Sequence, residues 1–202
     1  MSDTNRPYAL DIPDRDNLDD EMRTLVKGIE KKYGFMPNFL KFFKTDNQRL
    51  RAFIVPYMEL MRADSGLTLE EHEMIALVCA ATNGCFYCQL HHGALAREIT
   101  GDTMLAEQMS RNYKLADLSA RHRAMLDYVV KVSTEAESID DDDRDALRGH
   151  DFDDETIWSI TSTACYFASV NRMSQAIGLV PAREYLDMYR TETNAIVSAG
   201  QL

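Results

Sequence analysis

The sequence predicts an all-α fold, and three observations favour it. No stretch keeps the period-two alternation of a half-buried β-strand, whereas apolar residues recur at helical spacing in many segments. Only 9 glycines and 5 prolines occur in 202 residues, so the chain has few of the residues that make tight turns between strands. Hydrophobic residues make up 45% and charged residues 27%, as in ordinary globular proteins. We expect residues 1–202 to form a single helical domain.

Capping residues, glycines and prolines divide the chain into the expected helices. Residues 1–15, with Pro7 and Pro13, are expected to form an extended arm. Helices are then expected over residues 16–33, 39–44, 48–62, 68–82, 85–101, 102–112, from 119 onward, 155–177 and 182–193, the last followed by a tail to 202. The run Asp140–Asp143 either begins a further helix, where the helix dipole favours anions, or forms a solvated turn.

The helix after Thr68 carries two further signals. Thr68 followed by Glu71 is the pattern of a capping box. Leu67-Thr68 before this apolar helix is echoed by Phe152-Asp153 before another, which indicates a possible degenerate internal repeat. The second copy has no cysteine pair, so only the first half is expected to carry chemistry.

Charge and cysteine content restrict the partners and the compartment. The net charge is −11 and the isoelectric point is about 4.9, so nucleic acid and anionic membranes are not expected as partners, because both repel an acidic surface. No apolar stretch approaches the roughly 18 residues of a membrane span, and the N-terminus does not resemble a secretory signal. Four cysteines without an export signal indicate the reducing cytoplasm. A close cysteine pair there is redox-active or metal-binding more often than structural.

That pair is Cys85 and Cys88, preceded by Gly84 and separated by Phe86 and Tyr87. This spacing places both cysteines in the first turn of a helix, where free N–H groups and the positive end of the dipole stabilise a thiolate. A thiolate attacks a peroxide oxygen, and a second cysteine within one turn can resolve the sulfenic acid as a disulfide. The segment is therefore predicted to be a redox site.

His92 and Glu73 are expected to complete this site. His92 follows Cys88 by four residues, on the same face of the helix, and can act as a general base. If the two helices that meet at the Asn83-Gly84 turn pack antiparallel, Glu73 lies within one turn of His92 and can orient it. Glu73 could instead be a surface carboxylate, as Glu70 and Glu71 are expected to be.

Other interpretations of these residues stay open. Cys85, Cys88, His91 and His92 could together bind zinc, but four ligands on barely two turns of one helix are hard to close into a tetrahedron. No metal and no cofactor is therefore expected. His91 is either solvated or supports the site, and Tyr87 either supports it or simply packs.

The remaining cysteines and histidines are expected to have no role in the chemistry. Cys79 and Cys165 lie among apolar helical neighbours and are predicted to be inert core thiols. His72, His122 and His150 have no nearby cysteine or acidic pattern of this kind and are predicted to lie at the surface.

The spacing Glu73, eleven residues, Cys85-x-x-Cys88, three residues, His92 resembles the signature of the alkyl hydroperoxidase D-like branch of the carboxymuconolactone decarboxylase superfamily. Segments quoted from elsewhere in the chain resemble its peroxidase-related subgroup, and the likeness spans roughly residues 20 to 190. These segments are Gly34-Phe-Met-Pro-Asn-Phe-Leu, Leu67-Thr-Leu-Glu-Glu-His-Glu-Met-Ile-Ala, Ala116-Asp-Leu-Ser-Ala-Arg-His-Arg-Ala-Met-Leu-Asp, Glu155-Thr-Ile-Trp and Asn171-Arg-Met.

The resemblance implies an all-α subunit that forms dimers, trimers or hexamers, and a thiol peroxidase activity. By the family's pattern Cys88 would attack a hydroperoxide, Cys85 would resolve the product, and His92 with Glu73 would relay the proton. A dithiol partner, such as a lipoyl domain or a thioredoxin-like protein, would reduce the disulfide. Some relatives have a histidine where this chain has Tyr87, which removes one member of the relay. The alternatives are a disulfide reductase that uses the same cysteines and a non-catalytic, zinc-stapled helical oligomer.

Overall fold

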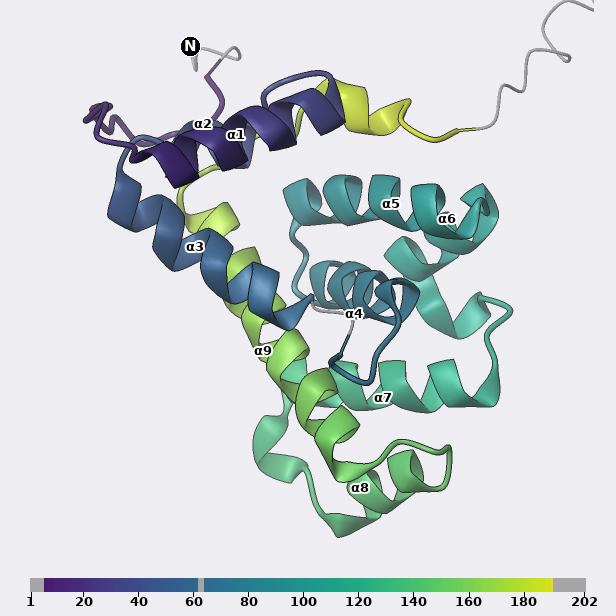
Figure 1. Cartoon of the computed structure of the whole chain (residues 1–202). Helices are drawn as coiled ribbons and strands as arrows, with labels where there is room; N and C mark the ends of the chain where they lie inside the picture. Colours follow the sequence, from purple (N-terminus) through teal and green to yellow (C-terminus); the bar gives the residue numbers. More distant parts are fainter. Residues whose placement is uncertain (1–5, 62–63, 191–202) are drawn as a thin grey trace, which may run out of the picture.

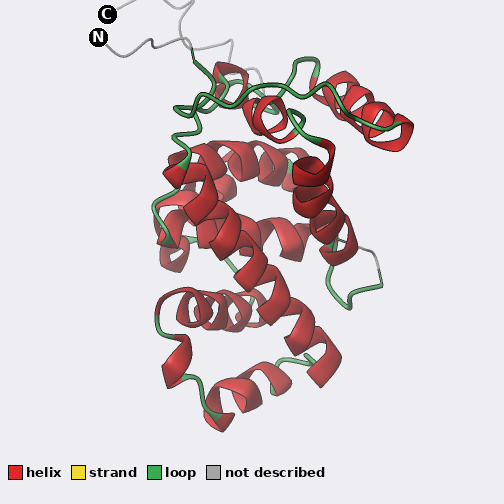
Figure 2. Ribbon diagram, turned by 90° about the vertical axis from the view of Figure 1, so that its left-hand side faces the viewer, coloured by secondary structure: helices red, strands yellow, loops and turns green. Residues whose placement is uncertain are grey.

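The computed structural model describes residues 6–61 and 64–190, and every regular element in these ranges is a helix (Figures 1 and 2). The predicted all-α fold is confirmed. The α-helices are α1 Asp20–Tyr33, α2 Asn38–Phe43, α3 Asn47–Leu60, α4 Leu69–Thr82, α5 Phe86–Thr100, α6 Thr103–Asn112, α7 Ala120–Thr134, α8 Asp141–Arg148 and α9 Asp154–Ala176. Three short 3₁₀ helices are η1 Tyr113–Leu115, η2 Ala136–Ser138 and η3 Arg183–Leu186. None of the described helices is both long enough and apolar enough to cross a membrane.

Helix α4 lies at the centre of the fold. Every residue from Glu71 to Ala80 is buried, as expected of a helix without a polar face. Helices α5, α6, α7 and α9 pack around it (Figure 1). The predicted capping box begins the helix: the Thr68 hydroxyl accepts the N–H of Glu71 at 3.1 Å, and the Glu71 carboxylate accepts the N–H of Thr68 at 2.9 Å.

A tight turn joins α4 to α5. Gly84 has a left-handed backbone, with φ of 64°, which a glycine adopts without steric cost. The N–H of Cys85 donates to the carbonyl of Ala80 at 2.9 Å, so α5 begins at once and packs along α4. The predicted helix pair is therefore present, and it carries the residues from Glu73 to His92.

Helices α1, α2 and α3 form a second hydrophobic cluster around Met22, Leu40 and Leu50. Helix α3 lies along α9 (Figure 1), and the Tyr166 hydroxyl donates to the carbonyl of Phe53 at 2.8 Å. This cluster faces α5 across the cysteine pair, so it can cover the site with side chains that are remote in sequence.

One helix start differs from the predicted one and one open alternative is decided, both for local reasons. Helix α1 begins at Asp20 rather than at residue 16, because the Asp19 carboxylate accepts the N–H of Met22 at 3.0 Å and caps it. The run Asp140–Asp143 does begin a helix: Asp140 caps α8, and the acidic residues fill its first turn. The two helices of the possible repeat, α4 and α9, both start from side-chain caps, Thr68 and Asp153.

The helix expected over residues 182–193 is absent up to residue 190, and residues 191–202 lie outside the described range. Only η3 forms there. The buried Arg97 guanidinium holds this segment, since it donates to the carbonyls of Tyr185 at 2.7 Å and Met188 at 3.0 Å. Tyr189 adopts a left-handed backbone with φ of 55°, which does not continue a right-handed helix.

Candidate active site

Both cysteines lie at the N-terminus of α5, as predicted. Cys85 is the N-cap, and its sulfur accepts the N–H of Cys88 at 3.4 Å. Cys88 lies in the first helical turn. Cys85 is fully buried, and only 3% of Cys88 is exposed. Both thiols are free in this structure, which therefore describes the reduced pair.

The pKa values of the two thiols are shifted in opposite directions. Donation by the Cys88 thiol lowers the pKa of Cys85 below its ordinary value, and the N–H groups of Cys88 and Tyr87 act in the same direction against burial. For Cys88 the pKa is raised, first by this donation to Cys85 and then by burial. The arrangement favours a thiolate on Cys85 and a proton on Cys88, so Cys88 needs a base before it can act as a nucleophile.

Glu73 and His92 form a buried pair beside the cysteines. The Glu73 carboxylate lies 2.8 Å from Nδ1 of His92, and 2% and 5% of the two residues are exposed. The ring of Phe167 on α9 packs edge-on against the imidazole at a centroid distance of 4.9 Å. With Nδ1 held by the carboxylate, the tautomer with a free Nε2 is favoured, and Nε2 can then accept a proton.

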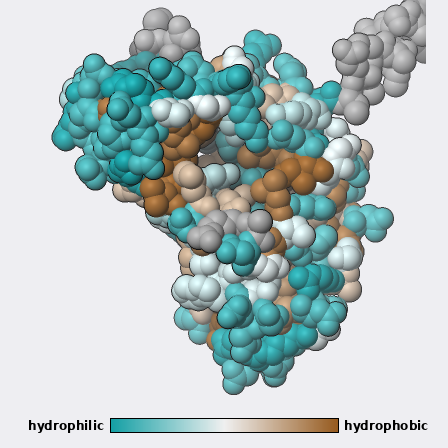
Figure 3. All heavy atoms as spheres, in the orientation of Figure 1, coloured by the Kyte–Doolittle hydropathy of each residue, from teal (hydrophilic) through white to brown (hydrophobic). Residues whose placement is uncertain are grey.

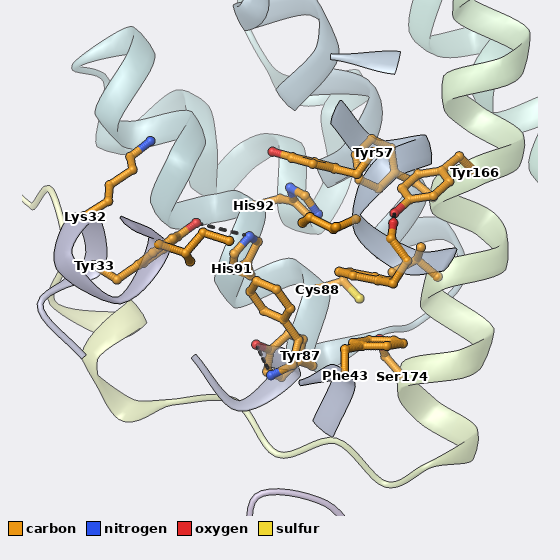
Figure 4. A pocket seen from close by; sticks show the side chains of 16 residues that line it. Lys32, Tyr33, Phe43, Tyr57, Tyr87, Cys88, His91, His92, Tyr166 and Ser174 are labelled. Atoms are coloured by element: carbon orange, nitrogen blue, oxygen red, sulfur yellow. Dashed lines mark hydrogen bonds between the residues drawn. The ribbon is translucent and has the colours of Figure 1, made fainter. Parts of the chain in front are cut away.

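A cavity of about 220 Å³ opens beside these residues (Figure 4). Its walls come from α1, α2, α3, α5 and α9, and most of its lining side chains are aromatic. The lining residues are Ile29, Lys32, Tyr33, Phe39, Phe43, Phe53, Ile54, Tyr57, Tyr87, Cys88, His91, His92, Tyr166, Phe167, Val170 and Ser174. On the face shown in Figure 3, hydrophobic residues gather around a hollow between α3 and α5.

The two cysteines differ in their relation to this cavity. Cys88 and His92 line it, whereas Cys85 does not. A molecule in the cavity therefore meets the Cys88 sulfur and the His92 imidazole, while Cys85 lies behind them. Cys88, which lines the cavity, has the raised pKa. Cys85, which is favoured as a thiolate, is shielded from the cavity.

Comparison with known proteins identifies the family. The carboxymuconolactone decarboxylase family model matches residues 48–103, which run from α3 to the first residue of α6. An uncharacterized peroxidase-related protein from Silicibacter sp. TM1040 is 38% identical, with a TM-score of 0.88 over 94% of this chain and 100% of that one. The chain belongs to the alkyl hydroperoxidase D-like branch of the carboxymuconolactone decarboxylase superfamily.

Two further solved structures are similar to this AhpD-like protein. One is an AhpD core, an uncharacterized peroxidase-related protein from Ralstonia eutropha JMP134, 35% identical, with a TM-score of 0.86 over 92% of this chain and 97% of that one. The other is the debrominase Bmp8 in complex with 2,3,4-tribromopyrrole, 19% identical, with a TM-score of 0.71 over 85% and 92% of the two chains. The second likeness shows the fold alone. No curated protein matches the sequence.

Tyr87 stands between the cysteines of this AhpD-like protein, and the hydrogen-bond partners of its hydroxyl are Phe39 and Tyr185. It accepts the N–H of Phe39 at 3.2 Å and lies 3.4 Å from the hydroxyl of Tyr185. Burial raises the pKa of Tyr87, so the phenol stays protonated. These contacts favour a packing role for Tyr87.

We therefore expect Tyr87→Phe to change stability more than chemistry. Loss of the hydroxyl leaves the N–H of Phe39 without its acceptor, which should lower the free energy of unfolding by about 1 kcal/mol. Peroxide consumption should stay within about threefold of the unmodified protein, because a packing hydroxyl contributes no proton transfer. Denaturant titration and a steady-state assay measure the two effects. A tenfold loss of rate at unchanged stability would contradict the packing role.

His91 is half-buried and lines the same cavity as Cys88. Its Nε2 is 3.5 Å from the Tyr33 hydroxyl, its ring stacks on Tyr87, and it meets the ring of His92 edge-on at 4.9 Å. Burial lowers the pKa of His91 well below 6.5. A neutral imidazole beside Cys88 fits a supporting role.

Three predicted placements are wrong. His72 is buried, because its Nε2 lies 2.8 Å from the Ser65 hydroxyl and α7 and α9 pack over α4. Glu71 is buried as well, since it caps α4 and binds Arg121 at 3.2 Å. Cys165 is exposed, although its neighbours Thr163, Ala164 and Phe167 on α9 are buried. Cys79 is buried as predicted, and burial raises its pKa to about 12.

The buried histidines predict a loss of stability in mild acid. Burial lowers the pKa of His72 and of His91 below the ordinary value of 6.5. The unfolded chain then binds protons near pH 6.5 that the folded protein does not, so the free energy of unfolding falls as the pH drops below about 6.5. Thermal unfolding from about pH 7.5 to about pH 5.5 measures this. The unfolding temperature should fall less with decreasing pH in His72→Gln than in the partly exposed control His150→Gln. An equal fall in the two variants would contradict the assignment.

The zinc alternative gains no support from the geometry. Within residues 6–61 and 64–190, no three His, Cys, Asp or Glu side chains are arranged to hold a metal ion. Nδ1 of His92 is taken by Glu73, and Nε2 of His91 faces Tyr33. Metal analysis of the purified protein is the direct test of that alternative.

Several cavity residues were not singled out from the sequence, above all the aromatic rings of α1, α2, α3 and α9. Ser174 on α9 lines the cavity with Cys88, Asn171 is buried one turn before it, and both lower the pKa of Cys88. Asn171 begins the segment Asn171-Arg-Met that resembles the family. Its amide lies between Phe167, Val170 and Ser174 on one face of the helix, and a polar residue on such a face is the signal that indicates a buried role.

Proposed function

We propose that this AhpD-like protein is a thiol-dependent peroxidase that reduces hydroperoxides through a Cys85/Cys88 dithiol–disulfide cycle. The observation that carries the proposal is the cavity wall formed by Cys88 and His92, with Glu73 bound behind His92 at 2.8 Å. A nucleophile and a base thus lie in the wall of one cavity, with a residue that orients the base directly behind it.

The proposed cycle has two covalent steps, oxidation of Cys88 and formation of the disulfide with Cys85. His92 takes the proton of the Cys88 thiol, and the thiolate attacks the terminal oxygen of ROOH. The O–O bond breaks, the sulfur is oxidised to a sulfenic acid, and RO⁻ leaves as ROH with the proton from His92. The Cys85 thiolate then attacks the sulfenic acid of Cys88, which forms the disulfide and releases hydroxide, protonated to water. The lowered pKa of Cys85 suits it to this second step.

The cavity favours an organic hydroperoxide over hydrogen peroxide. Its walls are mainly aromatic, and its volume of about 220 Å³ exceeds what hydrogen peroxide needs. An apolar body on the substrate gains binding free energy in proportion to the area it buries, about 25 cal/mol per Å². Hydrogen peroxide gains nothing from such walls, so we propose a substrate whose hydroperoxide group is attached to an apolar or aromatic body.

A dithiol must then reduce the disulfide. Because Cys85 is fully buried and Cys88 nearly so, a dithiol on a slender arm, such as that of a lipoyl domain, fits the site better than the surface of a thioredoxin-like protein. We also propose a homo-oligomer, a dimer, trimer or hexamer, as the resemblance to the family implies, and we expect it to cover the side chain of Trp158 on α9, which is 69% exposed in the single chain. Light scattering on the purified protein tests the assembly.

The deciding experiment is peroxide consumption with several dithiol donors. Cumene hydroperoxide and hydrogen peroxide are each supplied with dihydrolipoamide, a lipoyl domain or thioredoxin. We expect turnover with the organic hydroperoxide and a lipoyl dithiol. Oxidation of the cysteine pair by small disulfides but not by peroxides would favour a disulfide reductase instead. Bromide release from 2,3,4-tribromopyrrole without peroxide turnover would indicate a chemistry closer to that of the debrominase.

A further inference from the structure

A buried amide on α9 contacts the turn that precedes the cysteine pair and has no role in the cycle described above. Asn171 is fully buried. Its Nδ2 is within hydrogen-bonding geometry of no acceptor in the described part of the chain. A buried amide N–H without a partner costs free energy, so such a group calls for an explanation.

The orientation of this amide is fixed by a second asparagine. Asn83, in the turn before Cys85, donates through Nδ2 to the carbonyl of Cys79 at 2.8 Å, which settles which end of its side chain is nitrogen. The same Nδ2 donates to Oδ1 of Asn171 at 3.2 Å. Because the oxygen of Asn171 is bound to Asn83, its N–H₂ group is the free end.

Ser174 supplies a second donor one turn further along α9. It is buried and lines the cavity (Figure 4). Both Asn171 and Ser174 interact with the Cys88 side chain in the direction that lowers its pKa, against the larger effects of Cys85 and burial. Hydrogen bonds to an ion are shorter and stronger than those to its neutral form, so both contacts should tighten when Cys88 loses its proton.

We propose that Asn171 and Ser174 are positioning residues that donate hydrogen bonds to the Cys88 thiolate and hold its sulfur toward the cavity. His92 removes the proton from one side of Cys88, and the α9 donors stabilise the resulting anion from the other side. The unpartnered amide is then a site prepared for a charge that exists only in the reactive state. The inference rests on the proposed function only for its consequence, a faster attack on peroxide.

The test measures the thiolate without any peroxide. In a Cys85→Ser, Cys165→Ser background, the rate of alkylation of Cys88 by iodoacetamide is followed against pH, and the labelled peptide is identified by mass spectrometry. Asn171→Leu keeps the size of the side chain but lacks the donor. We expect the pKa of Cys88 to rise by about one unit, so that alkylation near neutral pH slows about tenfold. Ser174→Ala should slow it about threefold.

Thr163→Val is the matched control, since Thr163 is also on α9, fully buried and without a partner for its hydroxyl in the described residues, but lies outside the cavity lining. Its alkylation profile should match that of the background protein. Profiles unchanged in both Asn171→Leu and Ser174→Ala would overturn the inference. If Asn171→Leu does not fold, Asn171→Ser and Ser174→Ala carry the same test. A shifted profile in a protein that consumes no peroxide would sink the proposed function and leave the inference intact.

Discussion

Cys88→Ser is expected to abolish peroxide consumption, with a loss of at least about 10³-fold. The serine hydroxyl is a poor nucleophile at neutral pH, and among the described cavity-lining residues Cys88 is the one cysteine. No other thiol can take its place from its present position. Cys85 and Cys165 do not line the cavity, and Cys79 is fully buried, which raises its pKa to about 12.

Cys85→Ser should fail in a different way. The first step remains, so one equivalent of peroxide is consumed and the product is a sulfenic acid on Cys88 that lacks its resolving thiol. Dimedone labelling of the Cys88 peptide detects that acid. Cys165→Ser is the matched control, because it removes an exposed thiol from the same helix that carries Asn171, and its steady-state rate should equal that of the unmodified protein.

Two outcomes would refute this assignment. Sustained turnover in Cys88→Ser would mean that another group attacks the peroxide. Dimedone labelling of Cys85 in the Cys88→Ser protein, with a rate near that of the unmodified enzyme, would mean that the sulfur with the lowered pKa is the nucleophile despite its burial. The accessibility of Cys88 and the acidity of Cys85 point to different sulfurs, so the pair of variants separates the two properties.

The contact between Glu73 and His92 could be predicted because it depends on local geometry alone. The turn at Asn83-Gly84 joins two helices that must pack antiparallel, and residues at similar distances from the turn then face each other. The capping box at Thr68 fixed the start of α4 in the same way. Helix periods, caps and breakers are encoded within a few neighbouring residues, so a single sequence is enough to locate them.

The cavity could not be predicted, because it depends on packing between distant segments. Tyr33, Phe53 and Tyr166 come from three helices, and nothing in their local sequence indicates that they face Cys88. The burial of His72 has the same origin, since its polar partner is Ser65 and its cover comes from other helices. Residues placed by tertiary contacts look like ordinary core or surface residues until the helices are arranged in space.

Glu73→Gln is expected to lower peroxide turnover by about 10- to 100-fold. Gln keeps the size of the side chain and an oxygen that can accept from Nδ1 of His92, so the buried contact at 2.8 Å can persist. The negative charge is lost, and with it the stabilisation of the imidazolium that forms when His92 takes the proton of Cys88. Because the pKa of Cys88 is raised, the enzyme depends on this base at neutral pH.

The pH dependence distinguishes a proton relay from a structural contact. As the pH rises, the Cys88 thiol loses its proton to solvent without help from His92, so the defect of Glu73→Gln should shrink toward alkaline pH. A purely structural defect would not recover in this way. Glu70→Gln, in the first turn of the same helix and outside the cavity lining, is the control and should match the unmodified protein at every pH. A defect of constant size across the pH range would remove Glu73 from the relay and leave it a packing role beside His92.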